Sequence, residues 1–307
     1  MSNQQPPTKK IKMFSSDSLV SAIPFEVWRD VIGRTLGYSD RLNLNVTCKE
    51  FDITFGDYKQ KFLKKHAIHI PQDVRTIEKA MELVEKLQMD PTEKDPLRIV
   101  LDKGVHEIKG GPRRDRGRFE LDCSHITFIG KGFAQTTILG GFFVENYQNV
   151  TFAELTISNP TGYGLWLRGS TVHVLKCVLE ECGYTGMFVW VGTTVTATQC
   201  TFMENMGDGV HCWGAKLRLN DCTIHHNGVA GLNAEKDAVV DLHGTKTNIH
   251  SNYMFGIAAT KNAKVNIHLP YYRTVGDTQK QDNGGSIANM NADGTFTHVV
   301  DEELIHY

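Results

Sequence analysis

The acidic and histidine side chains of this 307-residue chain offer few pairs with the spacing of a catalytic site. General acid–base hydrolysis needs two carboxylates, or a carboxylate and another proton carrier, held on one face. The nearest candidates are Asp208 with His211 and Asp221 with His225. Asp208 lies in Gly207-Asp208-Gly209, a typical turn sequence, and thirteen histidines make chance pairs common. We therefore interpret both pairs as solvated surface groups and predict no catalytic residues.

The cysteines are spaced neither for a disulfide framework nor for a structural zinc site. Their number is odd, and no two of them form a Cys-x-x-Cys pair. We expect free thiols in a reducing compartment, no bound metal and no cofactor. The seven cysteines are Cys48, Cys123, Cys177, Cys182, Cys200, Cys212 and Cys222.

A repeat of 22 to 25 residues runs through the second half of the chain and must position any functional side chains there. Each unit carries a glycine followed by an aliphatic residue, and valines and cysteines recur at fixed distances from it. A unit of this length cannot bury its own apolar face, so successive units must stack. The repeat glycines are Gly164, Gly186, Gly209, Gly231 and Gly256.

The pattern inside each unit alternates as in a strand and shows no helical period, which predicts a right-handed parallel β-helix of about six or seven coils. Asn205, Asn227 and Asn252 each lie four residues before a repeat glycine. We expect them to stack as an asparagine ladder at a turn, and we expect Cys177, Cys200 and Cys222 to stack inside the coils as small apolar residues.

Residues two and four positions after the repeat glycines should point outward. Because adjacent coils are about 4.8 Å apart, the aromatic residues among them should form one surface patch. Such a patch is typical of a binding surface for a protein or a sugar, unless the N-terminal helices cover it. The predicted target-binding patch consists of Trp166, Phe188, Trp190, His211 and Trp213.

The residues before the repeat divide into three segments. Residues 1–17 are polar, and their basic cluster Lys9-Lys10-Ile11-Lys12 reads as a disordered tail or a nuclear import signal. Residues 18–70 have the apolar spacing of short helices. Within residues 71–96, a helix over 73–88, capped by Asp73, should cover the open end of a β-helix that spans 97–307.

Residues 19–63 resemble an F-box, and residues 73–300 resemble the right-handed β-helix of pectinase-type proteins. The first match runs through Ile23-Pro24, Glu26-Val27-Trp28, Val31-Ile32, Asp40, Leu42, Thr47-Cys48-Lys49 and Phe51, with Ile23 where the family has leucine. The second begins with Thr76-Ile77 and Ala80 and continues with Arg98-Ile99-Val100-Leu101 and Gly104. The whole chain is similar to F-box proteins with β-helix repeats.

The resemblance implies a substrate-recognition adaptor, in which the F-box binds the Skp adaptor of a cullin-type ubiquitin ligase and the β-helix binds an unknown target protein. Carried over by position, the expected adaptor-binding residues are Ile23, Pro24, Val27, Val31, Leu42, Cys48 and Phe51. The alternatives are a carbohydrate-binding or carbohydrate-active β-helix protein, or a non-catalytic structural repeat protein. The Asn-Thr-Asp, Asp-Asp and Gly-His-Gly motifs of galacturonan hydrolases do not occur.

Charge and hydropathy limit the partners. Thirty-three basic and 35 acidic residues give a net charge of -2, so we expect no nucleic acid partner. No apolar stretch of about 18 residues occurs, so we expect no membrane span. The polar N-terminus lacks the apolar region of a secretory signal, and we expect a cytoplasmic or nuclear location.

Overall fold

The computed structural model describes residues 67–86, 89–109, 117–268, 277–291 and 295–298. All of them lie in the second of two compact units, which cover residues 1–58 and 59–307. The predicted basic tail and the F-box-like motif lie outside the described residues.

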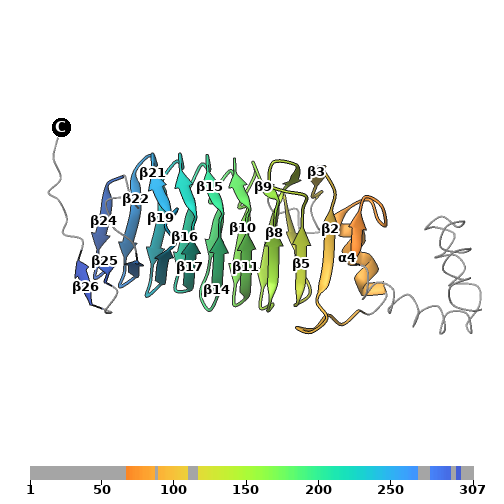
Figure 1. Cartoon of the computed structure of the whole chain (residues 1–307), viewed down its shortest axis with the longest axis horizontal. Coiled ribbons are helices and arrows are strands. Elements are labelled where there is room, and N and C mark those ends of the chain that lie inside the picture. Colours follow the sequence, from red (N-terminus) through yellow and green to blue (C-terminus); the bar gives the residue numbers. More distant parts are fainter. Residues whose placement is uncertain (1–66, 87–88, 110–116, 269–276, 292–294, 299–307) are drawn as a thin grey trace, which may run out of the picture. The chain divides into compact units, whose positions relative to one another are not determined.

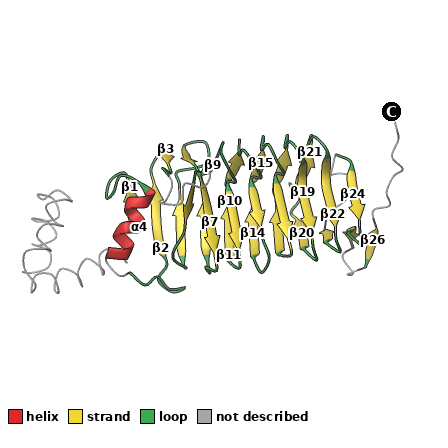
Figure 2. Cartoon of the chain, turned by 180° about the vertical axis from the view of Figure 1, so that it is seen from behind, coloured by secondary structure: helices red, strands yellow, loops and turns green. Residues whose placement is uncertain are grey.

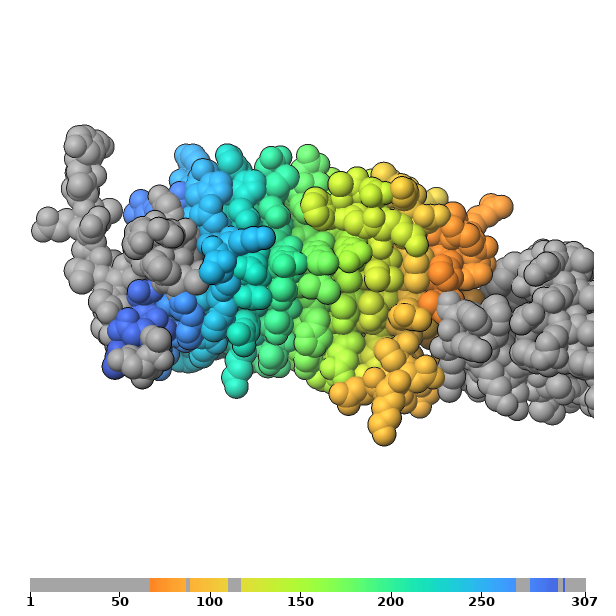
Figure 3. Space-filling model, in the orientation of Figure 1, coloured from red at the N-terminus to blue at the C-terminus, as the bar shows by residue number. Residues whose placement is uncertain are grey.

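The described residues form the predicted right-handed parallel β-helix, with three sheets that run along its axis (Figure 1). Nearly all strands pair in parallel with the equivalent strand of the next coil, and in sequence colour the coils form successive bands (Figure 3). The eleven-stranded sheet contains β1 (Ile68–Ile70), β2 (Leu97–Leu101), β5 (Ile126–Ile129), β8 (Val150–Ala153), β11 (Thr171–Leu175), β14 (Thr194–Thr198), β17 (Lys216–Asn220), β20 (Val239–His243), β23 (Lys264–Ile267), β25 (Ser286–Met290) and β26 (Phe296–His298).

The other two sheets complete each coil. The eight-stranded sheet contains β4 (Arg118–Glu120), β7 (Gly141–Glu145), β10 (Leu165–Arg168), β13 (Met187–Val189), β16 (Val210–Trp213), β19 (Ala230–Glu235), β22 (Phe255–Thr260) and β24 (Gln279–Asp282). The seven-stranded sheet contains β3 (Gly104–Glu107), β6 (Thr136–Leu139), β9 (Thr156–Ser158), β12 (Val178–Glu180), β15 (Thr201–Met203), β18 (Thr223–His225) and β21 (Asn248–His250).

The core consists of the inward side chains of the three sheets, stacked in columns along the axis. One column on the eleven-stranded sheet pairs Val172 with Val195 and then Val195 with Leu217, all of them buried. The cysteines of the repeat are buried as predicted, and the Cys177 and Cys200 thiols donate to backbone carbonyls. Each column continues from coil to coil, which is why one apolar pattern recurs in every repeat.

The predicted asparagine ladder is confirmed. The Asn205 side-chain amide donates to Asn227 Oδ1 at 2.9 Å, and that of Asn227 donates to Asn252 Oδ1 at 2.9 Å. Asp277 extends the ladder by accepting a bond from the Asn252 amide at 3.0 Å. All three asparagines are buried, so the ladder satisfies polar groups that water does not reach.

The repeat glycines allow adjacent coils to approach closely. A Cβ atom on Gly231 would lie 2.7 Å from Asn252 Nδ2 and 2.8 Å from the Gly256 carbonyl oxygen. These separations are shorter than van der Waals contact, so the position next to the ladder requires glycine.

The N-terminal end of the β-helix differs from the prediction in two ways. The eleven-stranded sheet begins with β1, which lies inside the segment 18–70 predicted to be helical and pairs in parallel with β2. The helix α4 (Ile77–Lys86) lies at this end of the stack, as expected, and buries Ile77, Met81 and other apolar residues (Figure 2).

The predicted cap of this helix is wrong. Asp73 accepts a bond from the His69 amide at 2.8 Å, so its carboxylate closes the turn after β1. Thr76 precedes the helix, and its hydroxyl accepts a 3.3 Å bond from the Lys79 amide, as an N-cap residue does.

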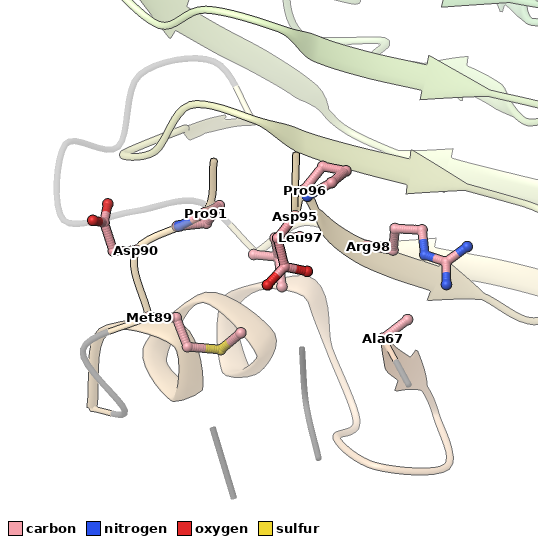
Figure 4. Close-up of a pocket in the computed structure, with 8 residues that line it drawn as sticks. All are labelled: Ala67, Met89, Asp90, Pro91, Asp95, Pro96, Leu97 and Arg98. Atoms are coloured by element: carbon pink, nitrogen blue, oxygen red, sulfur yellow. The ribbon is translucent and has the colours of Figure 1, made fainter. Parts of the chain in front are cut away.

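A small pocket opens between the end of α4 and the strands β1 and β2 (Figure 4). Its volume of about 10 Å³ is near the minimum for one water molecule, so it does not suit an organic ligand. Its lining residues are Ala67, Met89, Asp90, Pro91, Asp95, Pro96, Leu97 and Arg98.

At the C-terminal end, β26 pairs antiparallel with β25, while β24 continues the eight-stranded sheet. The described residues 277–285 therefore include a strand of the regular stack. In the part of the chain that the structure describes, no helix is long and apolar enough to cross a bilayer.

Candidate functional site

The eight-stranded sheet brings the five predicted patch residues together on its outer face. Trp166, Phe188 and His211 occupy equivalent positions on β10, β13 and β16, one coil after another. Trp190 follows β13 directly, and its ring stacks on that of Trp213 with the centroids 5.6 Å apart and the planes 9° apart. The positions two and four residues after each repeat glycine therefore share one face, as the spacing predicts.

The patch is less exposed than predicted. Trp166, Trp190, His211 and Trp213 are half-buried, and Phe188 is only 7% exposed. Phe188 is covered because its ring contacts the rings of His211, at a centroid distance of 4.9 Å, and Trp190, at 5.2 Å. Phe188 thus supports the surface from below and offers little area to a ligand.

Three further aromatic residues, which the sequence prediction missed, extend the patch. Phe143 precedes Trp166 in the same column and lies 5.3 Å from it, while Tyr163 stacks on Tyr184 at 5.2 Å. Phe143 could have been found, since it follows Gly141 as Trp166 follows Gly164. We call the whole set the aromatic strip: Phe143, Tyr163, Trp166, Tyr184, Phe188, Trp190, His211 and Trp213.

Cationic side chains lie over both ends of the aromatic strip. The Arg118 guanidinium lies 4.5 Å from the ring centroid of Trp166, and the Lys261 ammonium lies 4.6 Å from that of Trp213. Both distances suit cation–π attraction. The two cations therefore mark the limits of the strip along the axis.

A chain of charged groups borders the strip at His211. Its Nδ1 atom is 3.3 Å from Asp208 Oδ2, and its Nε2 atom is 3.5 Å from Glu235 Oε1. Glu235 in turn forms a 2.6 Å ion pair with Lys261. The side chains of Asp208, His211 and Glu235 are 8%, 16% and 15% exposed, so the prediction that Asp208 and His211 are solvated surface groups is wrong.

Asp208 is buried because it holds the next coil in place. Its Oδ1 atom accepts a 2.9 Å bond from the Ala230 amide, and its Oδ2 atom accepts a 3.2 Å bond from the Asn233 side chain. The carboxylate thus orients both His211 and Asn233, which are in register on β16 and β19. The result is a preformed row of polar groups beside half-buried indoles.

The second predicted pair, Asp221 and His225, is not brought together as an acid–base pair. Asp221 accepts a bond from the Lys246 amide at 3.1 Å. The His225 ring instead stacks on that of His250 at 5.2 Å, and its Nδ1 atom lies 2.7 Å from that of His226. Burial, followed by the charges of His250 and His226, lowers the pKa of His225.

The buried thiols are poorly suited to chemistry. Burial raises the pKa of Cys177, Cys182 and Cys212 to about 12, so at neutral pH they are protonated and weakly nucleophilic. The predicted adaptor-binding residues, from Ile23 to Phe51, lie outside the described residues, so the structure does not place them.

Comparisons with known proteins agree with the fold. Residues 119–217 and 140–270 match the family described as right handed beta helix region. The comparison with curated proteins found no match to the chain.

Several solved structures are similar at low identity. Pectin methylesterase from carrot is 12% identical, with 74% of this chain and 88% of that chain covered and a TM-score of 0.46. Pectate lyase Pel9A is 12% identical, covering 75% and 78%, with a TM-score of 0.43. Pectin methylesterase PemA from Erwinia chrysanthemi is 9% identical, covering 76% and 84%, with a TM-score of 0.42. Likenesses of this size carry no information about function.

Proposed function

We propose that the aromatic strip is a carbohydrate-binding face. The strip lies on the coils that match the right handed beta helix region. The observation that carries this proposal is the position of His211. Its imidazole is held between the carboxylates of Asp208 and Glu235, directly beside the rings of Phe188 and Trp213.

This combination of groups suits a sugar ring. A pyranose has an apolar face of C–H groups and a rim of hydroxyls, each of which can donate and accept hydrogen bonds. The half-buried indoles of Trp190 and Trp213 offer apolar contact, while Glu235 and Asn233 offer acceptors and donors a short distance away. A polar row fixed before binding limits the entropy lost on association.

The extended form of the strip favours a chain of sugars over a single one. The column Phe143, Trp166, Phe188 and His211 repeats once per coil, at about 4.8 Å, which is comparable with one monosaccharide unit. A linear oligosaccharide lying along the axis would pass over one residue of this column at every coil, with the covered Phe188 lying beneath it between Trp166 and His211.

The charges around the strip favour a neutral carbohydrate. Lys261 is paired with Glu235 at 2.6 Å, and Arg168 is paired with Glu145 at 3.1 Å. A polyuronate would have to compete with these carboxylates for Lys261 and Arg168, whereas uncharged hydroxyls would not. We therefore expect neutral glycans to bind more tightly than pectate or alginate.

The same contacts support binding more than cleavage. Both ring nitrogens of His211 face carboxylates, and Asp208 already holds two donors of the next coil. A general base needs a lone pair directed at substrate, whereas the Asp208 oxygens accept bonds from the protein itself and both His211 ring nitrogens lie within 3.5 Å of carboxylate oxygens.

Isothermal titration of the full chain with neutral and uronic oligosaccharides tests the proposal. We expect a neutral oligosaccharide to bind, and we expect Trp213→Ala to weaken it at least tenfold. Leu175→Ala, which truncates an exposed apolar residue of the eleven-stranded sheet, is the matched control and should bind normally. If no saccharide binds and Trp213→Ala instead abolishes capture of a protein, the face is a protein-binding surface. Release of oligosaccharide products would show cleavage.

A second function is supported by the F-box-like motif of residues 19–63. We propose that this segment binds a Skp-type adaptor and so links the β-helix, with its cytoplasmic or nuclear target protein, to a cullin ligase scaffold. The support is the ordered series from Ile23-Pro24 to Phe51. In this role the aromatic strip would bind the target.

A pull-down with purified Skp adaptor tests this second function. The truncated chain should lack residues 1–66 only, because β1 begins at Ile68 and belongs to the sheet. Adaptor retained by the full chain, and lost both by this truncation and by Pro24→Ala, would support it. Failure of the full chain to retain the adaptor would exclude it and leave the carbohydrate proposal unaffected.

A further inference from the structure

Asp241, His243 and His268 form a cluster on the outer face of the eleven-stranded sheet. Asp241 and His243 are alternate residues of β20, and His268 directly follows β23. The strands are in register, with Leu242 opposite Ile267, and the His268 amide donates to the Leu242 carbonyl at 3.0 Å. His268 therefore lies beside His243 on the neighbouring coil.

The three side chains offer ligand atoms at close range. The two imidazole rings stack with their centroids 4.0 Å apart and their planes 10° apart. His268 Nε2 lies 3.2 Å from Asp241 Oδ1, and one ligand atom from each residue lies within 4.8 Å of the others.

These separations are close to those of a metal site. Two ligands of a tetrahedral zinc ion with bonds of about 2.0–2.1 Å lie roughly 3.3 Å apart. The Asp241 and His268 atoms already have this separation, and rotation of the half-buried His243 ring would bring the third atom closer. The side chains of Asp241 and His268 are 37% and 32% exposed, so an ion can enter from solvent.

A neighbouring amide fixes the carboxylate. Asn266, which lies opposite Asp241 on β23, donates to Asp241 Oδ1 at 2.9 Å. Partners of this kind orient metal ligands. Arg218, the exposed in-register neighbour of Asp241 on β17, opposes a cation and should reduce its affinity.

We propose that Asp241, His243 and His268 bind a divalent transition-metal ion such as Zn²⁺, with the remaining position left to water. Two imidazoles and one carboxylate favour such an ion over Mg²⁺ or Ca²⁺, which prefer oxygen ligands. The ion would link two adjacent coils, because its ligands come from β20 and from the end of β23.

The site departs from the expectation of no metal that the cysteine spacing suggested. Its signal is a different one: His243 and His268 are 25 residues apart, which is the length of the coil between Gly231 and Gly256. In a stacked fold, side chains separated by one coil length become neighbours.

The chain offers a matched control in His225 and His250, which stack in the same way on the seven-stranded sheet at 5.2 Å and 4°. They share the histidine content and the stacking, but they are not part of a three-ligand cluster with a carboxylate among the described residues.

The experiment is titration of the full chain with Zn²⁺ alone, followed by calorimetry and thermal unfolding, with Co²⁺ absorption as a spectroscopic readout. We expect Zn²⁺ to bind and raise the melting temperature, and Mg²⁺ to have no effect at the same concentration. His268→Gln and Asp241→Asn should each weaken binding at least tenfold and abolish the Co²⁺ spectrum of four-coordinate sites. Arg218→Gln should tighten binding.

His225→Gln with His250→Gln should bind Zn²⁺ as the unaltered chain does. The proposal is overturned if this double variant loses the binding, if His268→Gln retains it, or if no Zn²⁺ binds. Binding that survives Asp241→Asn unchanged would also overturn the three-ligand site.

Discussion

The indole rings of Trp190 and Trp213 lie face to face across two adjacent coils, although 23 residues separate them in the chain. This relationship follows from the repeat alone, since each residue occupies the fourth position after its glycine. The β-helix converts spacing along the sequence into contact along its axis.

Removing one asparagine of the ladder should strongly destabilise the fold. In Asn227→Ala, the backbone and side-chain amides of Asn205 both lose the Asn227 Oδ1 acceptor, and the Phe202 carbonyl loses a 3.1 Å donor, all in the buried turn. We expect the free energy of unfolding to fall by about 2–4 kcal/mol, as for several unsatisfied buried groups. Urea unfolding measures it, and Asn248→Ala, an exposed residue of β21, should change it little. A loss below about 1 kcal/mol would contradict the ladder's role.

A methyl group at a repeat glycine should also be costly. In Gly231→Ala the new Cβ would meet Asn252 Nδ2 at 2.7 Å and the Gly256 carbonyl oxygen at 2.8 Å, so neighbouring coils must shift. We expect a loss of about 1–3 kcal/mol, the usual range for overpacking. Thermal unfolding measures the loss, with the exposed variant Lys264→Ala as the control. Equal melting temperatures for the two variants would show that the coils accommodate the methyl group.

Acidification should destabilise the fold through His225. Its usual pKa of 6.5 is lowered, first by burial and then by the charges of His250 and His226. At a pH well above the usual pKa of 6.5, the His225 imidazole is neutral in both the folded and the unfolded chain. As the pH falls below it, the unfolded chain takes up the proton first, so stability falls until the folded pKa is reached. The urea concentration at the unfolding midpoint should therefore decrease when the pH is lowered from about 7.5 to about 5.5, a range that brackets the usual histidine pKa.

His225→Gln should reduce this pH dependence, whereas substitution of the exposed His173 by Gln should not. An unaltered slope in His225→Gln would assign the acid sensitivity to other groups.

The thiols inside the coils should resist alkylation. Burial raises the pKa of Cys177, Cys182 and Cys212 to about 12, and it also keeps the reagent out. Peptide mass spectrometry after iodoacetamide treatment at about pH 8, below the usual pKa of a free thiol, should find these three modified only in denaturant. Rapid modification in the native state would show that the coils open locally.

The features that repeat in every coil could be predicted from the sequence. The glycine register gave the β-helix, the asparagine ladder and the meeting of Trp166, His211 and Trp213, because each depends on a single spacing. The burial of Asp208 could not be predicted, since its Gly-Asp-Gly setting indicates a turn and its partner, the Ala230 amide, belongs to the next coil.

The ends of the stack were also harder to predict than its middle. The repeat pattern does not extend to β1, so it does not predict this strand. The three residues of β1 are distant from β2 in sequence and form a strand by pairing with it. Asp73 and Thr76 are both good N-cap residues, and only the end of the preceding strand decides that Asp73 bonds to His69.

The position of the aromatic column has a consequence for how such a surface can change. Each coil contributes one outward side chain to the column from Phe143 to His211, and each coil contacts only its neighbours. Duplication of a single unit would therefore lengthen the surface by one step without redesigning the remainder. If a linear ligand lies along this surface as proposed, the number of units would set the length of ligand that it can hold.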